Sequence, residues 1–370
     1  MIMGSGSPDG RPQVQGADPA TVRRAVETGD PLPGTRGFAG RLDGRLLRDV
    51  LGRYPLFVDG DDLTSWAFEP VQLVDPVAVP AGHVQTEDGF RRRWSLPSPS
   101  PSGGSRAIDA LQSALEASLE AVETDGLAIA FSGGIDSALV AARLDAPLYV
   151  AGFPGSHDVA AARDAAGFLD ADLRVVELDH GALEAHVPDV VAATTRTNAM
   201  DVEIALPLFL VASAAAADGF DRLAVGQGAD ELFSGYAKVA NASEDPRLSA
   251  ETVRGARDEV LQTLPDQLER DALAIRAGGV EPVAPLLDDR VVEAALSLPD
   301  SLLISSRGDR KFALRLASRE WLPDSVAFRE KKALQYGSLV ARELDRLARQ
   351  AGFKRRMDDH VTQYVESLRG

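Results

Sequence analysis

Apolar segments of strand length alternate with longer amphipathic segments over most of the chain after residue 105. This alternation is typical of a parallel sheet whose strands are connected by helices. The pattern predicts strands at 126–131, 147–152, 173–178 and 222–226, and helices at 107–124, 138–144, 160–169 and 204–217. The remainder, 245–365, reads as mostly helical. We therefore expect an α/β fold, a doubly wound parallel sheet with a largely helical C-terminal part.

The first hundred residues follow a different pattern. Residues 1–36 are rich in Gly, Pro and Asp without sustained periodicity, so we expect a mostly disordered leader with a helical turn near Ala20–Thr28. Residues 37–97 carry short strand-like pieces broken by turns, which predicts a small β region. Residues 98–104 have the composition of a linker, and we expect one α/β domain over 105–365.

Composition narrows the class of protein. The chain has 370 residues, of which 45% are hydrophobic, and this is ample for a core. No run approaches about 18 consecutive apolar residues, so we expect no membrane span and a cytoplasmic protein. These residues include no cysteine, which excludes disulfides, thiolate metal sites and a cysteine nucleophile within them.

The net charge of −17 comes from abundant Asp and Glu beside only five lysines. Such a surface is typical of proteins from salt-loving organisms, and it argues against a broad nucleic-acid-binding face. Where lysine is this scarce, a lysine retained in a motif is a candidate for a chemical role.

One short run combines glycines, hydroxyls and an acid between a predicted strand and a predicted helix. This loop contains Ser132, Gly133, Gly134, Asp136 and Ser137. The glycines allow a tight turn, and backbone N–H groups at a helix N-terminus favour an anion such as phosphate. The acid would repel phosphate unless a cation lies between them, which suggests Mg²⁺. The loop lacks the Gly-Lys-Ser/Thr ending of a Walker A loop. It resembles the SGGxDS pyrophosphate loop of the ATP pyrophosphatase superfamily, which implies cleavage of ATP to AMP and pyrophosphate.

A second glycine loop, 226–236, follows the predicted fourth strand and carries Asp230 and Glu231. In doubly wound sheets, loops at the carboxyl ends of strands converge, so Asp136 and Asp230 are expected to share one Mg²⁺. The alternative is that both acids of this loop simply favour the positive end of a helix dipole.

Taken together, the motifs resemble the synthetase domain of the asparagine synthetase family. The family's SGGLDS and SGEGSDELFGGY runs are similar to the two loops. Further similarity lies in 149–158, in 279–288 (its VEVRVPFLD segment), and in 310–315 and 329–338, its C-terminal lysine segments. Residues 48–57, 79–84 and 94–97 are similar to parts of the family's glutaminase domain, in shortened form.

The resemblance implies a nucleotide fold of the adenine nucleotide alpha hydrolase type and a set of site residues. Pyrophosphate would be bound by Ser132, Gly133, Gly134 and Ser137, with Mg²⁺ on Asp136 and Asp230. AMP would contact Gly226 and the main chain near Gly152. The implied catalytic residues are Lys311, Lys331 (or Lys332, one register away), Glu281 near the acyl acceptor, and Glu231 toward a substrate ammonium group. For the lysines the alternative is an ordinary solvated charge, and for Glu281 a salt bridge with Arg270.

The departures from the family pattern concern the substrate. Gln227 stands where the family has a glutamate implicated in proton removal, and a glutamine is no general base. The segment 205–207 replaces a Ser/Thr-Pro segment, and Val283 replaces an arginine. The glutaminase cysteine is missing, so we expect no glutamine hydrolysis by these residues. The shortened region is expected to pack as a structural cap.

These observations predict an ATP-dependent amide-forming ligase that uses ATP and Mg²⁺, a small-molecule carboxylate, and ammonia or another amine. A separate glutaminase is an expected candidate partner. Two alternatives stay open. One is a tRNA-modifying enzyme of the same superfamily, against which the missing cysteines and the acidic charge argue. The other is a non-catalytic or regulatory nucleotide-binding protein.

Overall fold

The computed structural model describes residues 13–240, 250–329 and 336–369. The chain separates into two compact units, each built from several segments. Unit 1 comprises Met1–Val122, Gly226–Glu269 and Ala284–Pro323; unit 2 comprises Glu123–Val225, Arg270–Val283 and Asp324–Gly370. Of the residues expected to form one domain over 105–365, the segments 105–122, 226–269 and 284–323 belong to unit 1, and the extent of that domain stays a prediction.

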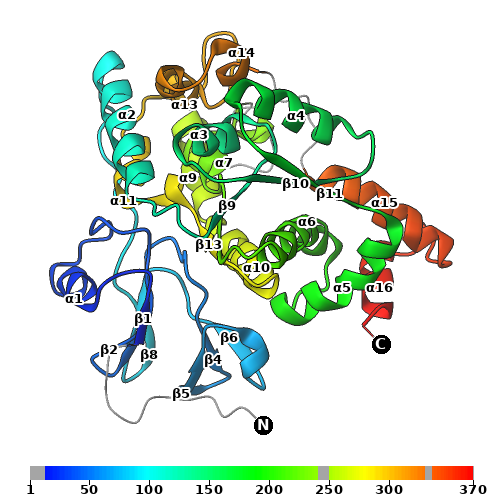
Figure 1. Ribbon diagram of the computed structural model, residues 1–370. Helices are drawn as coiled ribbons and strands as arrows, with labels where there is room; N and C mark the ends of the chain where they lie inside the picture. Colours follow the sequence, from blue (N-terminus) through cyan, green and yellow to red (C-terminus); the bar gives the residue numbers. More distant parts are fainter. Residues whose placement is uncertain (1–12, 241–249, 330–335, 370) are drawn as a thin grey trace. The chain divides into compact units, whose positions relative to one another are not determined.

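Unit 1 contains two small antiparallel sheets and several helices (Figure 1). One sheet has the order β1-β2-β3-β7-β8, with bounds Gln13–Gln15, Ala39–Leu42, Arg45–Arg48, His83–Thr86 and Gly89–Arg92. The other has the order β5-β4-β6, with bounds Asp62–Ala67, Phe57–Asp59 and Pro76–Ala78. The helices are α1 Pro19–Thr28, α2 Gly104–Glu120, α7 Ala229–Leu232, α8 Ala237–Ala240, α9 Val253–Leu261, α11 Asp289–Leu296, α12 Asp300–Leu303 and α13 Phe312–Ala317. Short 3₁₀ turns are η1 Pro70–Gln72, η2 Pro285–Leu287 and η3 Ser318–Glu320.

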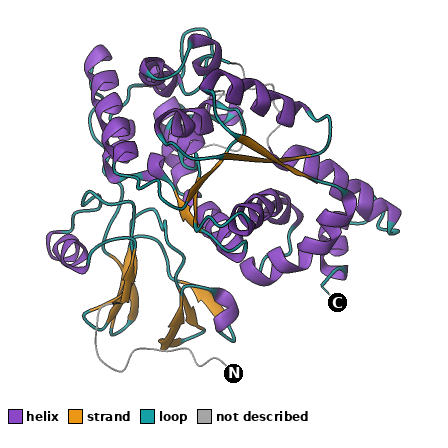
Figure 2. Cartoon of the chain, viewed as in Figure 1, coloured by secondary structure: helices purple, strands orange, loops and turns teal. Residues whose placement is uncertain are grey.

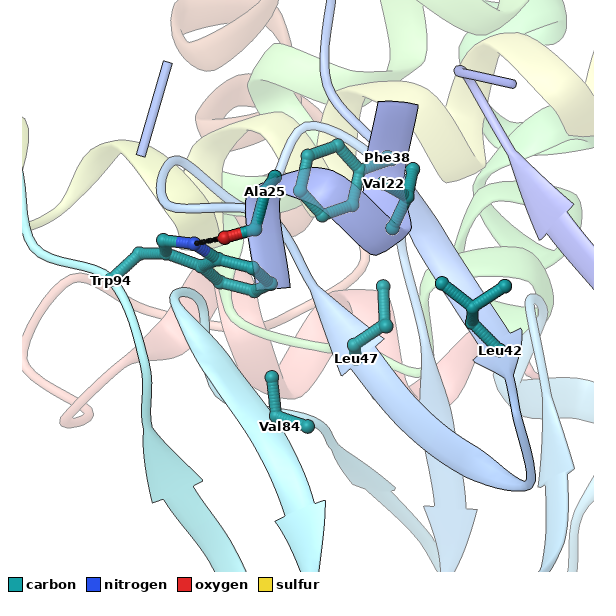
Figure 3. Packing of buried hydrophobic residues seen from close by; sticks show 7 residues of the cluster. All are labelled: Val22, Ala25, Phe38, Leu42, Leu47, Val84 and Trp94. Atoms are coloured by element: carbon teal, nitrogen blue, oxygen red, sulfur yellow. Dashed lines mark hydrogen bonds between the residues drawn. The ribbon is translucent and has the colours of Figure 1, made fainter. Parts of the chain in front are cut away.

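The helical turn expected near Ala20–Thr28 is confirmed as helix α1, whereas the disorder expected around it is wrong for the residues from Gln13 onward. Helix α1 begins at an Asp18 N-cap, whose carboxylate accepts hydrogen bonds from two backbone N–H groups, and ends at a left-handed Gly29. Its buried residues join a hydrophobic cluster in which Trp94 packs edge-on against Phe38 (Figure 3). The indole N–H donates to the Ala25 carbonyl, so α1 is fixed to the sheet. The leader residues 1–12 lie outside the described residues.

The buried polar groups of unit 1 are paired across segments distant in sequence. Arg53 binds Asp49 at 2.8 Å and Asp289 at 2.7 Å. Arg48 binds Glu269 at 3.0 Å, with both side chains almost fully buried. A buried charge requires such a partner, because its desolvation is otherwise uncompensated. These ion pairs tie the small β region to the helical segments of the same unit.

Unit 2 is built on a five-stranded sheet with the order β11-β10-β9-β12-β13, in which all neighbours are parallel. Its strands are β9 Leu127–Ala130, β10 Leu148–Gly152, β11 Leu173–Glu177, β12 Arg222–Ala224 and β13 Glu281–Val283. Four of them confirm the predicted strands, since near-continuous apolar runs are typical of parallel strands covered on both faces. The fifth, β13, was not predicted.

The helices of unit 2 cover both faces of this sheet. They are α3 Ile135–Arg143, α4 His157–Leu169, α5 His180–Thr194, α6 Ala199–Ala217, α14 Asp324–Ala327, α15 Tyr336–Gln350 and α16 His360–Ser367, and α10 Leu264–Ala277 crosses the boundary between the units. Helices α3 and α4 lie on one face and α6 on the other (Figure 1). The C-terminal part is mainly helical, as expected (Figure 2). The fold is therefore a doubly wound α/β sheet, and the strand order reverses between β9 and β12.

Helix α6 is long and apolar enough, by length and composition, to cross a membrane, and it is alone in this among the described residues. Half of its apolar window is buried, against β9, β10, β11 and neighbouring helices. A core helix has the same composition, so its packing accounts for its apolar character.

Candidate active site

The loop after β9 turns in a way that only glycine permits. Gly133 has φ +71°, and a Cβ there would lie 2.7 Å from the Ala161 carbonyl oxygen of α4. Gly134 is the N-cap of α3 and provides no side-chain cap, so the first N–H groups of α3 receive no hydrogen bond from a capping side chain. The loop lies beside the position where the strand order reverses, which is where open parallel sheets bind ligands.

Serine hydroxyls give this loop a fixed shape. The Ser137 hydroxyl donates to the Gly134 carbonyl at 3.2 Å and accepts from the Ser132 N–H at 3.1 Å. The Ser132 hydroxyl accepts weakly from the Gly134 N–H at 3.4 Å. Asp136 lies in the first turn of α3 with its Oδ1 atom buried. The structure thus brings together all five predicted residues of the first loop.

Gly152 ends β10 and is required there by packing. A Cβ at this position would lie 2.5 Å from the Val159 side chain and 3.1 Å from the Ser156 hydroxyl, which caps α4. The close approach of α4 is therefore sufficient to explain this glycine. Its proposed contact with AMP, through the main chain, stays a prediction.

In unit 1, the second loop pairs two of the predicted residues. The buried Lys311 ammonium lies 2.8 Å from Asp230 Oδ1. A Cβ at Gly235 would lie 1.9 Å from that oxygen and 2.3 Å from the Lys311 Cε atom, so only glycine leaves room for the pair. Lys311 adopts φ +57° as the N-cap of α13. Because a buried charge needs a partner, Asp230 and Lys311 form one unit.

Glu231 is directed into unit 1 and not toward solvent. It is almost fully buried, and its carboxylate accepts a hydrogen bond from the Tyr236 hydroxyl. Burial raises the pKa of Glu231, the charge of Asp230 acting in the same direction. The predicted contact of Glu231 with a substrate ammonium group would require this internal hydrogen bond to be replaced. In the same loop, Gly228 has φ +85° and faces the Leu287 side chain.

Glu281 does not lie at the carboxyl end of the strands, where the first loop is. It is the first residue of β13 and pairs in register with Arg222, which in turn pairs with Leu127 at the start of β9. The loop leaves the other end of β9, about 10 Å or more away at the usual rise per strand residue. Glu281 is exposed and ion-paired with Arg276 at 3.0 Å. Glu281 therefore forms the salt bridge that was its alternative, with Arg276 in place of Arg270, and its role near the acyl acceptor stays a prediction.

The structure describes only some of the residues predicted for the metal site and for the C-terminal lysine segments. Within the described residues, no cluster of three or more His, Asp or Glu forms a metal cage. Mg²⁺ commonly takes one or two carboxylates together with substrate phosphates and waters, so the buried Asp136 oxygen fits such a site. Lys331 and Lys332 lie outside the described residues.

Two residues of the second loop's surroundings were not identified from the sequence. Arg310 donates to the Gly235 carbonyl at 2.6 Å, beside the Asp230–Lys311 pair. Its position next to Lys311 was a usable signal. Ser234 is fully buried with φ +59° and occupies a family glycine position, which was a second signal.

The geometry of the first loop is typical of one class of protein. In α/β proteins that hold a phosphate group, a glycine loop and a helix N-terminus without a side-chain cap lie where the strand order of a parallel sheet reverses. The family model described as asparagine synthase matches residues 108–262 and 254–368 of this chain. The chain therefore belongs to the asparagine synthase family.

Individual relatives agree with this assignment. A protein of Methanocaldococcus jannaschii, named as a glutamine-hydrolyzing asparagine synthetase, is 30% identical over 66% of this chain and 51% of its own length. Asparagine synthetase B of Escherichia coli is 26% identical over 83% of this chain and 62% of its own length. The chain thus spans about half the length of the curated relatives it matches. A solved structure titled as a predicted tRNA methyltransferase subunit aligns with 18% identity and a TM-score of 0.23, too low to support an inference.

Proposed function

We propose that this chain is an ATP-dependent amide-forming ligase that activates a carboxylate as its adenylate. The carboxylate oxygen attacks the α-phosphorus of ATP, and the bond to the β-phosphate breaks, releasing pyrophosphate. The nitrogen of ammonia or an amine then attacks the acyl carbon, loses a proton, and displaces AMP. The observation that carries this proposal is the rigid loop around Gly133 at the reversal point of the sheet, in a member of the asparagine synthase family.

The residues of this chain have distinct proposed roles. The N–H groups around Gly134 and the Ser132 hydroxyl bind the pyrophosphate part of ATP. Asp136 and Asp230 are the proposed ligands of Mg²⁺, which when bound neutralises phosphate charge. Lys311 is held by Asp230, and is proposed to bind negative charge that develops on the phosphates. Gly152 and Gly226 are proposed to contact AMP, and Lys331 or Lys332 the leaving pyrophosphate.

The nitrogen donor is proposed to be ammonia or another amine that arrives without glutamine hydrolysis by these residues. They include no cysteine to serve as the glutaminase nucleophile. A separate glutaminase is therefore the proposed partner in ammonia supply. Gln227 has no basic group for removing the proton of the attacking amine, so substrate or solvent would take it.

The test is a pyrophosphate-release assay with Mg·ATP, a panel of amino acids and other carboxylic acids, and ammonium. We expect pyrophosphate to appear with one acid, and one AMP for each pyrophosphate. The Asp136→Asn variant should lose this release. The control Arg276→Gln, on α10 and ion-paired with Glu281 at the amino end of β13, should keep it. ATP binding without turnover across the whole panel would refute the ligase and favour the non-catalytic nucleotide-binding alternative.

A further inference from the structure

Arg329 is fixed beside the first loop by a contact that the sequence did not indicate. It follows α14, which packs against α3, the helix that begins at the loop. Its guanidinium Nη1 donates to the Ala161 carbonyl of α4 at 3.1 Å. All these segments belong to unit 2. The contact therefore gives one cationic side chain a defined place next to α4.

The same carbonyl oxygen is the atom that faces Gly133. It lies 2.7 Å from the position of a Cβ at that glycine. With ordinary bond lengths, the Arg329 Nη1 atom is then within about 7 Å of the Gly133 Cα atom. Arg329 is also partly exposed. A guanidinium at this distance can reach a phosphate held by the loop with a small rotation of its side chain.

We propose that Arg329 is a phosphate-binding residue that recognises the β,γ-pyrophosphate part of ATP and the pyrophosphate product. This proposal rests on the proposed function, because it assumes that the first loop holds ATP. A guanidinium is permanently charged and presents five N–H donors in a planar fork that matches phosphate oxygens. The Ala161 carbonyl orients this fork.

The proposal makes a prediction that separates phosphate recognition from a structural role. AMP lacks the β- and γ-phosphates, so its affinity should not depend on Arg329. In Arg329→Gln, the affinity for Mg·ATP and for inorganic pyrophosphate should fall about 10- to 100-fold, the usual effect of losing a charge-assisted hydrogen bond. The affinity for AMP should stay within about twofold. Isothermal titration of all three ligands measures this difference.

Two further variants sharpen the result. Arg329→Lys keeps the charge and loses the fork, so its ATP affinity should lie between those of the wild type and Arg329→Gln. Arg276→Gln removes an arginine of the same unit, on α10 beside Glu281 at the amino end of β13, and should change none of the affinities. Equal losses of ATP and AMP affinity in Arg329→Gln would show a structural role and overturn the proposal, as would unchanged pyrophosphate affinity. A wild-type protein that binds no ATP would refute the proposed function, and this inference with it.

Discussion

Replacing Ser234 by glycine should stabilise the protein. Ser234 lies in the second loop, is fully buried, and adopts φ +59°, a left-handed conformation that glycine reaches without strain. Its hydroxyl has no hydrogen-bond partner within the described part of the chain. Both features oppose folding, and glycine removes both.

The expected gain follows from three contributions. A left-handed residue with a Cβ costs roughly 1–2 kcal/mol. A buried hydroxyl without a hydrogen bond costs about 1–3 kcal/mol. Glycine costs about 0.5–1 kcal/mol of this gain, because its unfolded state has a larger conformational entropy. The net gain at Ser234 should be about 1–4 kcal/mol, or roughly 1–6 °C in the unfolding midpoint of a chain of this size.

Differential scanning calorimetry of the wild type, Ser234→Gly and Ser234→Ala tests this reasoning. Alanine deletes the hydroxyl and keeps a Cβ at positive φ, so its midpoint should lie between the other two. If Ser234→Gly unfolds at or below the wild-type temperature, the hydroxyl has a partner in solution and the argument fails. Strain of this kind often persists at functional loops, so nucleotide affinity should be measured in parallel.

Three other predictions concern separate parts of the molecule. Gly133→Ala places a Cβ 2.7 Å from the Ala161 oxygen, so ATP affinity should fall at least about tenfold; unchanged affinity by titration would contradict the loop assignment. Burial, followed by the charge of Asp345, raises the pKa of Glu203 to about 7, above its unfolded value of 4.5. The contribution of the protonated Glu203 carboxyl to stability is thus full below about pH 4.5 and is lost as the pH rises through about 7. Between pH 5 and 8, the thermal unfolding midpoint of Glu203→Gln should depend less on pH than that of the wild type; identical pH slopes would exclude this. Trp94→Ala should lower the free energy of unfolding by about 3–5 kcal/mol in denaturant titrations, and a loss below about 1 kcal/mol would mean that the cluster of Figure 3 contributes little.

The sheet of unit 2 was predictable because its strands are apolar runs between turn residues. Strand β13 was missed for a physical reason: it has three residues, and one is Pro282, which normally argues against a strand. As the last strand of the sheet, β13 tolerates a missing N–H. Helix α1 was predictable for a local reason. Its Asp18-Pro19 start and Gly29 end are helix signals, and the helical turn expected near Ala20–Thr28 lies within it; the surrounding Gly, Pro and Asp led instead to the wrong expectation of disorder around it.

The candidate site was predictable where its residues are close in sequence. The loop from Ser132 to Ser137 consists of six consecutive residues that contact one another, so its sequence motif is enough to predict its conformation. The pairing of Asp230 with Lys311 depends on tertiary packing, and no local pattern specifies it. The similarity of 279–288 to the family's VEVRVPFLD segment suggested a role for Glu281, but it could not show at which end of a strand this residue lies. Strand register decides that, and it set Glu281 apart from the loop.

The small β region of residues 37–97 has a structural connection to the second loop, within unit 1. Arg53 donates to the Leu287 carbonyl and to Asp289, each at 2.7 Å. The Leu287 side chain lies against Gly228, so closely that a Cβ on this glycine would be 2.2 Å from it. A buried arginine of the β region thus fixes the residue that supports the turn before Asp230. Because a buried charge without its partners is costly, this region cannot be removed without disturbing that turn.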